Sequence, residues 1–447
     1  MTTPEVFNDL CEELSTCKDI DLLTASSEIE RFSKDAYEYS PVLVDSLKDC
    51  RAELVVRPQS LDAVKMVASA CAIRKVPLTL RGSGTGNYGQ CVPLRGGVVM
   101  LMGAFSRVES FDQKTGIVKV QPGCLLRDLE RFLAIYGRQL RLVPSTWRSA
   151  SVGGFFAGGS GGIGSVRWGF LRDPGHLISL EIITVERIPK QLHLDAKHAE
   201  ALNHAYGTNG IVTALSLSTT RAVSWQEVSI DCSDWPEAVD LLLCCSRAAI
   251  NLNLCSLVEK DIVKHLPNWY GLTSGSHRLL LLVESDSLST VERLANSKEA
   301  TFRHLGSEKD QKGAGLKELV WNHTTLHMRA ANSDWTYLQM LLPQPELPVM
   351  RSLKKRWGNE LLWHLEVVRQ QGSQRLAALP LVKWRGKEHL EELIANCKEL
   401  GAVLFNPHVL TVEEGGLGLV DGDQVAAKRR FDPHGLMNPG KLKGWSG

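Results

Sequence analysis

The first 80 residues show most clearly how apolar and polar positions alternate. The run "AELVVRP", residues 52–58, is apolar at most positions and predicts a strand that ends at Pro58. Residues 59–75 carry apolar side chains three and four positions apart, and Ser60 can cap the helix that this spacing predicts. The run "VPLTL", residues 76–80, predicts a second strand. This order is typical of a βαβ unit.

Shorter elements follow as far as residue 222. An amphipathic helix is expected over residues 125–137, ending near Gly137. The strands expected around it cover residues 97–102, 107–112, 117–122, 176–186 and 211–223.

From about Trp225 the pattern changes, because glycine-rich turns disappear and tryptophan and histidine become common. Helices are expected over residues 234–250, 288–299 and 389–403, and strands over 277–285 and 361–369. We therefore predict an α+β protein with four parts. They are a helical N-terminal lead-in (1–50), a first α+β domain (51–222), a second α+β domain (223–404) and a C-terminal segment (405–447).

Composition excludes several classes of function. The chain of 447 residues has 51 Lys and Arg against 50 Asp and Glu, so we expect no nucleic-acid partner. Its 11 cysteines are irregularly spaced and form no CxxC motif, which is typical of reduced thiols in a cytoplasmic protein. No signal peptide is expected, because the first 20 residues lack a charged start followed by an apolar core. No transmembrane segment is expected either, since the best apolar run, residues 238–258, contains Asp240 and Arg247.

Two glycine-rich tracts are the strongest chemical signal. The first, "LRGSGTGNYGQ" (80–90), has four glycines, and the second (152–169) has eight glycines among eighteen residues. Glycine leaves backbone N–H groups open to a phosphate. The first tract contains a GxGxxG string, but no apolar helix follows it, and no P-loop string occurs. One tract alone could be a structural turn, whereas two predict walls around an extended phosphate-bearing cofactor.

These tracts and their surroundings resemble a known family. Residues 55–86, "VKVQPGCLLRDLERFL" (118–133) and "PSTWRSASVGGFFAGGSGGIGSVRWG" (144–169) resemble the FAD-binding domain of the vanillyl-alcohol oxidase and p-cresol methylhydroxylase flavoproteins. So do "YGTNGIVTALSL" (206–217) and "DPHGLMNPGKL" (432–442). The branch of glycolate oxidase subunits and D-lactate dehydrogenase-like proteins is the most similar. The resemblance implies a PCMH-type FAD-binding domain of two α+β subdomains, with a separate α+β substrate domain covering the flavin.

The resemblance also implies which residues contact FAD. Around the pyrophosphate it places Pro77, Arg81, Gly82, Ser83, Gly84, Thr85, Gly86 and Asn87. Along the length of the cofactor it places Ser145, Thr146, Ser151, Gly153, Gly154, Gly158, Gly161 and Gly162. At the adenine end it places Gly210, Ile211 and Val212, and near the isoalloxazine ring Asn438.

Two departures from the family pattern change the expectation. Many relatives bond the flavin to a histidine in the first tract or to a cysteine in the second, and this chain has neither residue at those places. Cys124 lies outside both tracts. We therefore expect FAD to bind non-covalently. The HxGDGNxH string found in the glycolate and D-lactate branch is also absent, which puts hydroxy-acid substrates in doubt.

Four residues outside the tracts are candidates for catalysis. His323 and His327 are four apart and would share one face of a helix, and Glu366 follows His364 on one side of a strand. His408 lies near the start of the C-terminal segment, where the chain returns to the first domain. Histidine can accept a hydroxyl proton near neutral pH. We hypothesise that His323, His327, Glu366 and His408 converge above the flavin. Each histidine could instead be an ordinary buried residue, and a His/His/Glu metal site is an alternative that nothing in the sequence requires.

Recognition of a substrate carboxylate would call for an arginine. Arg148, Arg329 and Arg369 are candidates with little to rank them, and Trp147, just before the second tract, could face the flavin.

The function that this sequence predicts best is oxidation of a CH–OH group of a small polar substrate, such as a hydroxy acid, sugar or polyol, by hydride transfer to FAD. An electron-acceptor protein or a quinone is a possible partner. Two alternatives remain open: a non-catalytic or electron-transfer FAD-binding subunit, and a nicotinamide-dependent flavin reductase.

Overall fold

A computed structural model describes residues 3–272, 275–310 and 314–446. The first sheet has four strands in the order β1-β2-β4-β3, and only β1 is antiparallel to its neighbour. These strands are β1 (Ile20–Leu23), β2 (Leu54–Pro58), β3 (Leu78–Arg81) and β4 (Val98–Leu101). The helices around them are α1 (Pro4–Ser15), α2 (Ser26–Phe32), α3 (Pro41–Leu47) and α4 (Leu61–Arg74).

The expected βαβ unit is present as β2, α4 and β3. The Ser60 side chain accepts the N–H of Ala63 at the start of α4, as the sequence predicted. The lead-in differs from the prediction because it contributes a strand as well as helices. Ile20 pairs with Pro58, so β1 extends the sheet at its edge. The apolar run that forms β1 is only four residues long, too short to distinguish from the helical pattern around it.

The second sheet is antiparallel, with strand order β5-β6-β10-β8-β9, and β7 pairs with the end of β10. Its strands are β5 (Val108–Asp112), β6 (Ile117–Val120), β7 (Arg138–Leu140), β8 (Leu177–Ile183), β9 (Gln191–Asp195) and β10 (Ile211–Arg221). The helices among them are α5 (Leu126–Ala134), α6 (Val152–Gly158), α7 (Ser165–Trp168) and α8 (Ala196–Ala199). The helix predicted over residues 125–137 and the strands predicted between residues 107 and 223 have counterparts here, while the strand predicted over 97–102 is β4 of the first sheet.

We call residues 225–404 the second domain. Its main sheet is antiparallel in the order β14-β11-β13-β12-β18-β19-β16-β21, and a small sheet β15-β20-β17 lies beside it. The main strands are β11 (Trp225–Cys232), β12 (Leu252–Val258), β13 (His277–Glu284), β14 (Thr301–Ser307), β16 (Met340–Leu341), β18 (His364–Gln370), β19 (Ser373–Ala378) and β21 (Val403–Leu404). The small sheet comprises β15 (Trp335–Tyr337), β17 (Leu361–Leu362) and β20 (Leu381–Lys383).

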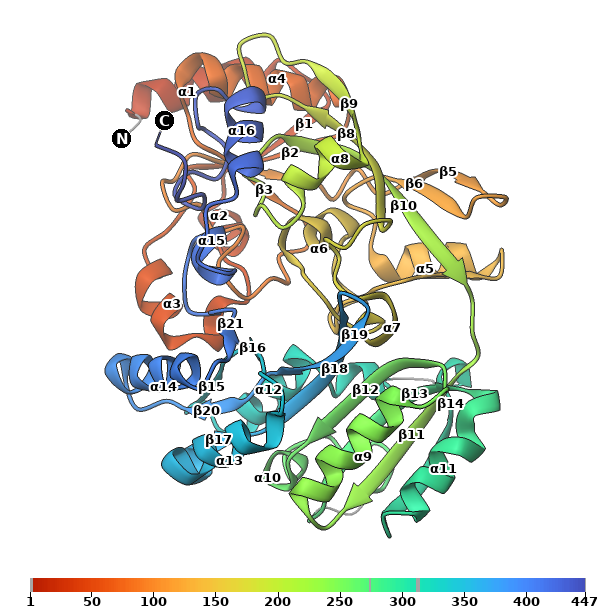
Figure 1. The fold of residues 1–447 in the computed structure, drawn as a ribbon. Helices are drawn as coiled ribbons and strands as arrows, with labels where there is room; N and C mark the ends of the chain where they lie inside the picture. The colour runs from red at the N-terminus through yellow and green to blue at the C-terminus, as the bar shows by residue number, and fades with distance from the viewer. Residues whose placement is uncertain (1–2, 273–274, 311–313, 447) are drawn as a thin grey trace.

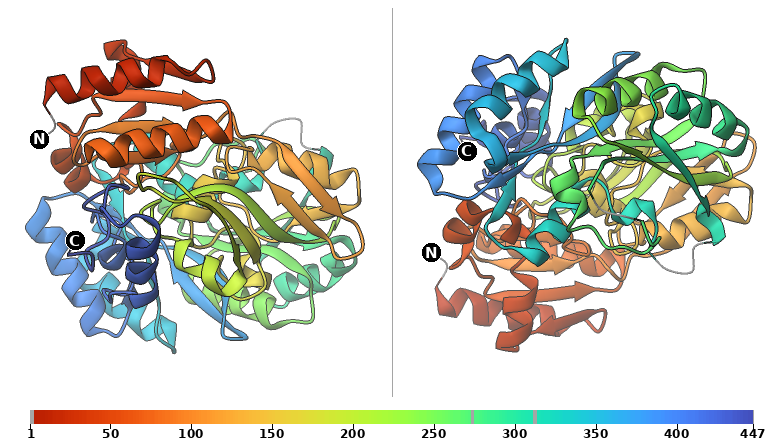
Figure 2. Two further views of the ribbon diagram at one scale, coloured as in Figure 1. Left: turned by 90° about the horizontal axis from the view of Figure 1, so that it is seen from above. Right: turned by 90° about the horizontal axis from the view of Figure 1, so that it is seen from below.

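Helices cover these sheets, as Figures 1 and 2 show. They are α9 (Trp235–Arg247), α10 (Lys260–Val263), α11 (Leu288–Asn296), α12 (Asn322–Ala331), α13 (Glu346–Trp357) and α14 (Lys387–Glu399). Helices α9 and α11 share a hydrophobic cluster with β11, β12 and β13. None of the helices in the described part of the chain is both long and apolar enough to cross a membrane.

The C-terminal segment returns to the first domain, where α16 contacts the short helix of residues 200–202. It contains α15 (Val412–Gly415) and α16 (Gly422–Phe431). The N–H of Leu78 in β3 donates to the Leu436 carbonyl (2.8 Å), and the Asn438 N–H donates to the Leu78 carbonyl (2.8 Å). The last residues therefore lie along the outer edge of β3.

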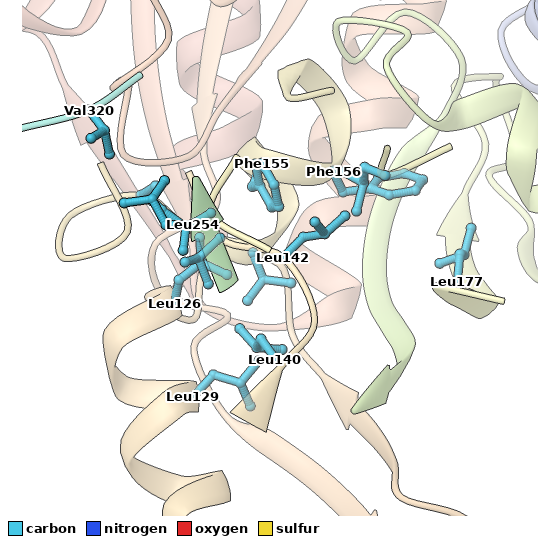
Figure 3. Close-up of a cluster of buried hydrophobic side chains, with 14 of the residues drawn as sticks. Leu126, Leu129, Leu140, Leu142, Phe155, Phe156, Leu177, Leu254 and Val320 are labelled. Atoms are coloured by element: carbon cyan, nitrogen blue, oxygen red, sulfur yellow. The ribbon is translucent and has the colours of Figure 1, made fainter. Parts of the chain in front are cut away.

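One hydrophobic cluster joins the two domains. Leu126 and Phe155 of the first domain share it with Leu254 of β12 and with Val320, and all four are at least nine-tenths buried. Figure 3 shows side chains of this cluster, these four among them. Apolar burial of this kind holds the second domain against the first.

Candidate functional site

A central cleft opens between the two sheets of the first domain and is closed on one side by the second domain. Its cavity volume is about 230 Å³. Ten of its lining residues are glycines: Gly82, Gly84, Gly86, Gly153, Gly154, Gly158, Gly159, Gly161, Gly207 and Gly210. A wall so poor in side chains suits a long ligand that is bound through backbone groups.

The first wall is the loop of residues 82–91, which we call the first loop. It begins where β3 ends, and Gly84 has a φ of 71°, a conformation that other residues adopt at a cost. Gly82 lies so close to the second wall that a Cβ there would collide with Ser151 Oγ. The two glycine-rich tracts therefore meet across the cleft, as the sequence predicted from their pairing.

The second wall is the segment 144–161, which we call the second loop. Ser151 caps α6, because its Oγ accepts the Gly154 N–H (3.2 Å). Gln90 Nε2 donates to the Gly158 carbonyl (3.0 Å) and so links the two loops. Both loops are thereby fixed before any ligand binds.

Most of the residues assigned to FAD from the sequence line this cleft. They are Gly82, Ser83, Gly84, Thr85, Gly86, Asn87, Ser145, Thr146, Ser151, Gly153, Gly154, Gly158, Gly161, Gly210 and Val212.

Three of the assigned residues lie away from the cleft for simple geometric reasons. Pro77 precedes β3, at the opposite end of that strand from the first loop. Ile211 adjoins Val212 on β10, so its side chain points to the other face of the strand and is fully buried. Gly162 packs against the Val143 carbonyl, and its N–H donates to Ser165 Oγ (3.0 Å).

Arg81 and Asn438 act behind the walls instead of lining them. Arg81 turns under the first loop, where its guanidinium donates to the Lys34 carbonyl and lies over the Phe32 ring. Asn438 is 1 % exposed, and its Nδ2 donates to the carbonyls of Gln90 (2.7 Å) and Tyr206 (2.6 Å). It joins the first loop to the wall formed by residues 202–212.

The wall opposite the glycines consists of aromatic and amide side chains. Its residues are Tyr39, Tyr88, Trp321, Asn322, His323 and Gln339, which we call the roof. Only His323 was predicted from the sequence. Tyr88 lies within the first tract and Asn322 adjoins His323, so their place in or beside a motif is the one signal that could have found them. Nothing in the sequence indicates Tyr39 or Gln339.

Trp321 and its backbone set the position of His323. Trp321 has a φ of 52°, uncommon for a residue other than glycine, and it precedes the first turn of α12. The buried Glu366 carboxylate accepts the Trp321 N–H (3.0 Å) and holds this conformation. Helix α12 therefore starts at the cleft, with His323 in its first turn.

The imidazole of His323 makes no hydrogen bond to another described residue, which leaves it available to a ligand. Burial, and to a smaller extent the neighbouring His327, lowers the pKa of His323 to about 4. At neutral pH the side chain is therefore an uncharged proton acceptor.

The structure does not bring the four proposed catalytic residues together. His327 is one turn further along α12, and its Nε2–H donates to the Glu318 carbonyl (2.7 Å). Burial lowers the pKa of His327. Glu366 lies inside the β18 sheet, where His364 Nε2 (2.9 Å) and the Trp321 N–H are its partners. Neither side chain lines the cleft.

His408 was also expected at the flavin, and it lies elsewhere. Its Nε2–H donates to the Tyr337 carbonyl (2.8 Å), so Nδ1 accepts from Ser40 Oγ (2.6 Å). Ser40 caps α3, so His408 ties the lead-in to the second domain. Burial lowers the pKa of His408 to about 4. The sequence could not reveal this partner, because Ser40 is 368 positions away.

The three candidate arginines also lie outside the cleft lining. Arg148 pairs with Glu318 (2.5 Å), Arg329 donates to the carbonyls of Ser333 and Trp335, and Arg369 donates to the Arg167 carbonyl (3.4 Å). Trp147 lies between Arg148 and Lys317, with each cation over its ring, and faces a second cavity and not the cleft.

We call that second cavity the charged cavity. It lies between the two domains, and its charged lining residues are Arg127, Glu130, Arg131, Arg138, Arg141, Arg148, Glu227, Glu308, Lys309, Lys317 and Glu318.

The chemistry of the cysteines and acids adds two facts. Cys91 lines the cleft at the end of the first loop, and burial raises the pKa of its thiol to about 12, so it is protonated. In the described ranges, no group of three or more His, Cys, Asp or Glu side chains is arranged to hold a metal ion.

Comparison with known proteins gives a family for the first domain. Residues 52–186 match the family described as "FAD binding domain". The chain is 21 % identical over 431 residues to the glycolate oxidase subunit GlcD of Bacillus subtilis, covering 87 % of this chain and 88 % of that protein. It is 26 % identical over 435 residues to the mitochondrial D-2-hydroxyglutarate dehydrogenase of Arabidopsis thaliana, covering 88 % and 75 %.

Solved structures show the same fold. An alkyldihydroxyacetonephosphate synthase matches with a TM-score of 0.73 at 15 % identity, over 99 % of this chain and 86 % of that one. A BBE-like 1 variant from Physcomitrella patens matches with a TM-score of 0.68 at 13 % identity, over 97 % and 98 %. At these identities the likeness is one of fold.

Proposed function

We propose that the protein is an FAD-dependent oxidoreductase acting on the CH–OH group of a small polar substrate, because residues 52–186 match the family of FAD-binding domains. The single observation that carries the proposal is the central cleft, where two glycine-rich loops face a roof that contains one unbonded, uncharged histidine. The relatives named for the oxidation of hydroxy acids support the same reaction type.

The described residues fit FAD. The first and second loops present backbone N–H groups where Cβ atoms would fill the space, as at Gly82. Ser83, Thr85, Ser145 and Thr146 add hydroxyl groups along the cleft. These loops would hold the cofactor, and bound FAD would supply the oxidant that accepts the hydride from the alcohol carbon.

His323 is the residue placed to move the proton. As the alcohol carbon loses hydride, the hydroxyl proton passes to the unprotonated nitrogen of His323, and the carbon–oxygen bond becomes a carbonyl. The pKa of about 4 keeps His323 unprotonated at neutral pH. Tyr88 does not compete for this role, because burial raises the pKa of its phenol to about 12.

The spectrum of the purified protein tests the proposal. We expect a yellow protein whose flavin is bleached anaerobically by an alcohol and recovers in air or with an added acceptor. A protein that takes up no FAD contradicts the proposal. Flavin that binds but is bleached by no alcohol favours the electron-transfer subunit, and bleaching by NADPH without substrate favours the reductase.

Three finer points are also proposals. FAD binds non-covalently, because Cys91 is a protonated thiol and no histidine lies in the first loop, so acid precipitation should release the flavin. The electron acceptor is oxygen, a quinone or a protein. The protein is cytoplasmic, on the strength of 11 free cysteines, and cell fractionation tests this.

A further inference from the structure

The central cleft differs from a hydroxy-acid site in its charge. Among the described residues that line it, none is Asp, Glu, Lys or Arg, and His323 is uncharged at neutral pH. A carboxylate that leaves water needs a cation or several hydrogen-bond donors, because burial of an unpaired charge is unfavourable.

The two cations beside the first loop have other partners. Arg81 donates to the Lys34 carbonyl behind the first loop, and Lys441 Nζ donates to the Gly89 carbonyl (2.6 Å). Arg148 pairs with Glu318, and Arg329 donates to the carbonyls of Ser333 and Trp335. None of these side chains lines the cleft, so the roof has no carboxylate clamp.

The roof instead offers neutral donors and acceptors. Gln339 Nε2 donates to Asn322 Oδ1 (3.2 Å), which leaves Gln339 Oε1 and Asn322 Nδ2 for a ligand. An amide acceptor and an amide donor beside His323 match the alternating donor and acceptor character of neighbouring hydroxyl groups.

We propose that the substrate is an uncharged polyhydroxy alcohol, a polyol or a sugar, and not a hydroxy acid. This inference rests on the proposed function and specifies the substrate class for the same site. It separates this chain from the relatives that are named for glycolate, D-lactate and D-2-hydroxyglutarate.

Matched pairs that differ only in charge test the proposal. The FAD-loaded protein is mixed anaerobically with 1,2-propanediol or lactate, with ethylene glycol or glycolate, and with sorbitol or gluconate. We expect the neutral member of at least one pair to bleach the flavin at least 10-fold faster than its acid. Equal or faster bleaching by the acids overturns this inference and leaves the oxidoreductase proposal intact. Bleaching by none of the compounds contradicts both.

Binding without turnover gives a second measurement. Hydroxyacetone and pyruvate are the carbonyl products of propanediol and lactate, and calorimetry on the oxidised protein compares them. We expect heat of binding from hydroxyacetone alone, whereas tighter binding of pyruvate overturns the proposal.

A charge placed in the roof should reverse the preference. Asn322→Lys puts a cation in the cleft lining, and Asn332→Lys adds the same charge at the exposed end of α12 as the matched control. We expect Asn322→Lys to shift the ratio of neutral to acid bleaching rates at least 10-fold toward the acids, and Asn332→Lys to leave it unchanged. Equal ratios in both variants contradict a charge-selective roof.

Discussion

The two cavities between the domains have opposite chemistry. The central cleft is lined by glycine, amide and aromatic residues without a charged side chain among those described, whereas the charged cavity has seven Lys or Arg and four Glu. In the charged cavity, side chains pair with one another, as Arg148 does with Glu318. The contrast indicates that charge is used here to join the domains, while the cofactor cleft relies on bare backbone.

The strongest test of this contrast is to replace a glycine of the first loop by a residue with a large side chain. Gly84→Val places a branched side chain at a φ of 71° against the Arg81 guanidinium. We expect it to abolish FAD retention, measured as the ratio of flavin to protein absorbance after gel filtration. Gly372→Val is the matched control, because Gly372 also has a positive φ (83°) but lies in open space away from the cleft. Equal flavin content in both variants would show that the first loop is only a turn.

The next test removes the one proton acceptor of the roof. We expect His323→Gln to slow anaerobic flavin reduction by about 100- to 10,000-fold while the flavin stays bound. His327→Gln should change the rate by less than about 10-fold, since that side chain does not line the cleft. The wild-type rate should be constant from high pH down to about 5 and fall below that, because the pKa of His323 is about 4. Equal losses in both variants would exclude His323 as the base, whereas a profile that falls near pH 6.5 would contradict the lowered pKa of the base.

His408 tests whether a buried histidine away from the cleft serves stability. Its pKa is about 4 in the folded protein and about 6.5 when unfolded, so the unfolded chain binds more protons between these values. Its contribution is fully present above pH 6.5 and is lost as the pH falls toward 4. Between pH 7 and pH 4 the wild type should lose about 3 kcal/mol more unfolding free energy than His408→Gln. Urea unfolding of both proteins at several pH values measures this, and parallel curves would contradict it.

The smallest effect is expected in the charged cavity. Arg148 is about half exposed, so its pair with Glu318 should contribute at most about 1 kcal/mol. Arg148→Met should lower the unfolding free energy by no more than that amount and leave flavin content and reduction rate unchanged. Loss of flavin in this variant would mean that the charged cavity supports the cofactor as well as the domain interface.

Features of this protein that depend on residues close together in the chain could be predicted from its sequence. Features that depend on contacts between distant residues could not. The strands and helix around the glycine tracts follow from periodicity and capping, as at Ser60, where the partner is three residues away. The sequence predicted the part of the cleft wall that the first and second loops form. The roof was missed, because Tyr39 and Gln339 reach it from elements 300 residues apart in the chain. Glu366 and His408 were misplaced, since their partners Trp321 and Ser40 are distant in sequence.

The amino-acid sequence by itself determined that this protein has two glycine-rich walls for a phosphate-bearing cofactor. Glycine permits a positive φ and a close approach whatever surrounds it, so those properties belong to the residues themselves. Only the tertiary structure decided which histidine lines the cleft and which Lys and Arg side chains lie outside its lining. Whether a side chain lines a cavity depends on the long-range strand pairing and packing around it, and on the distant groups that claim its hydrogen bonds.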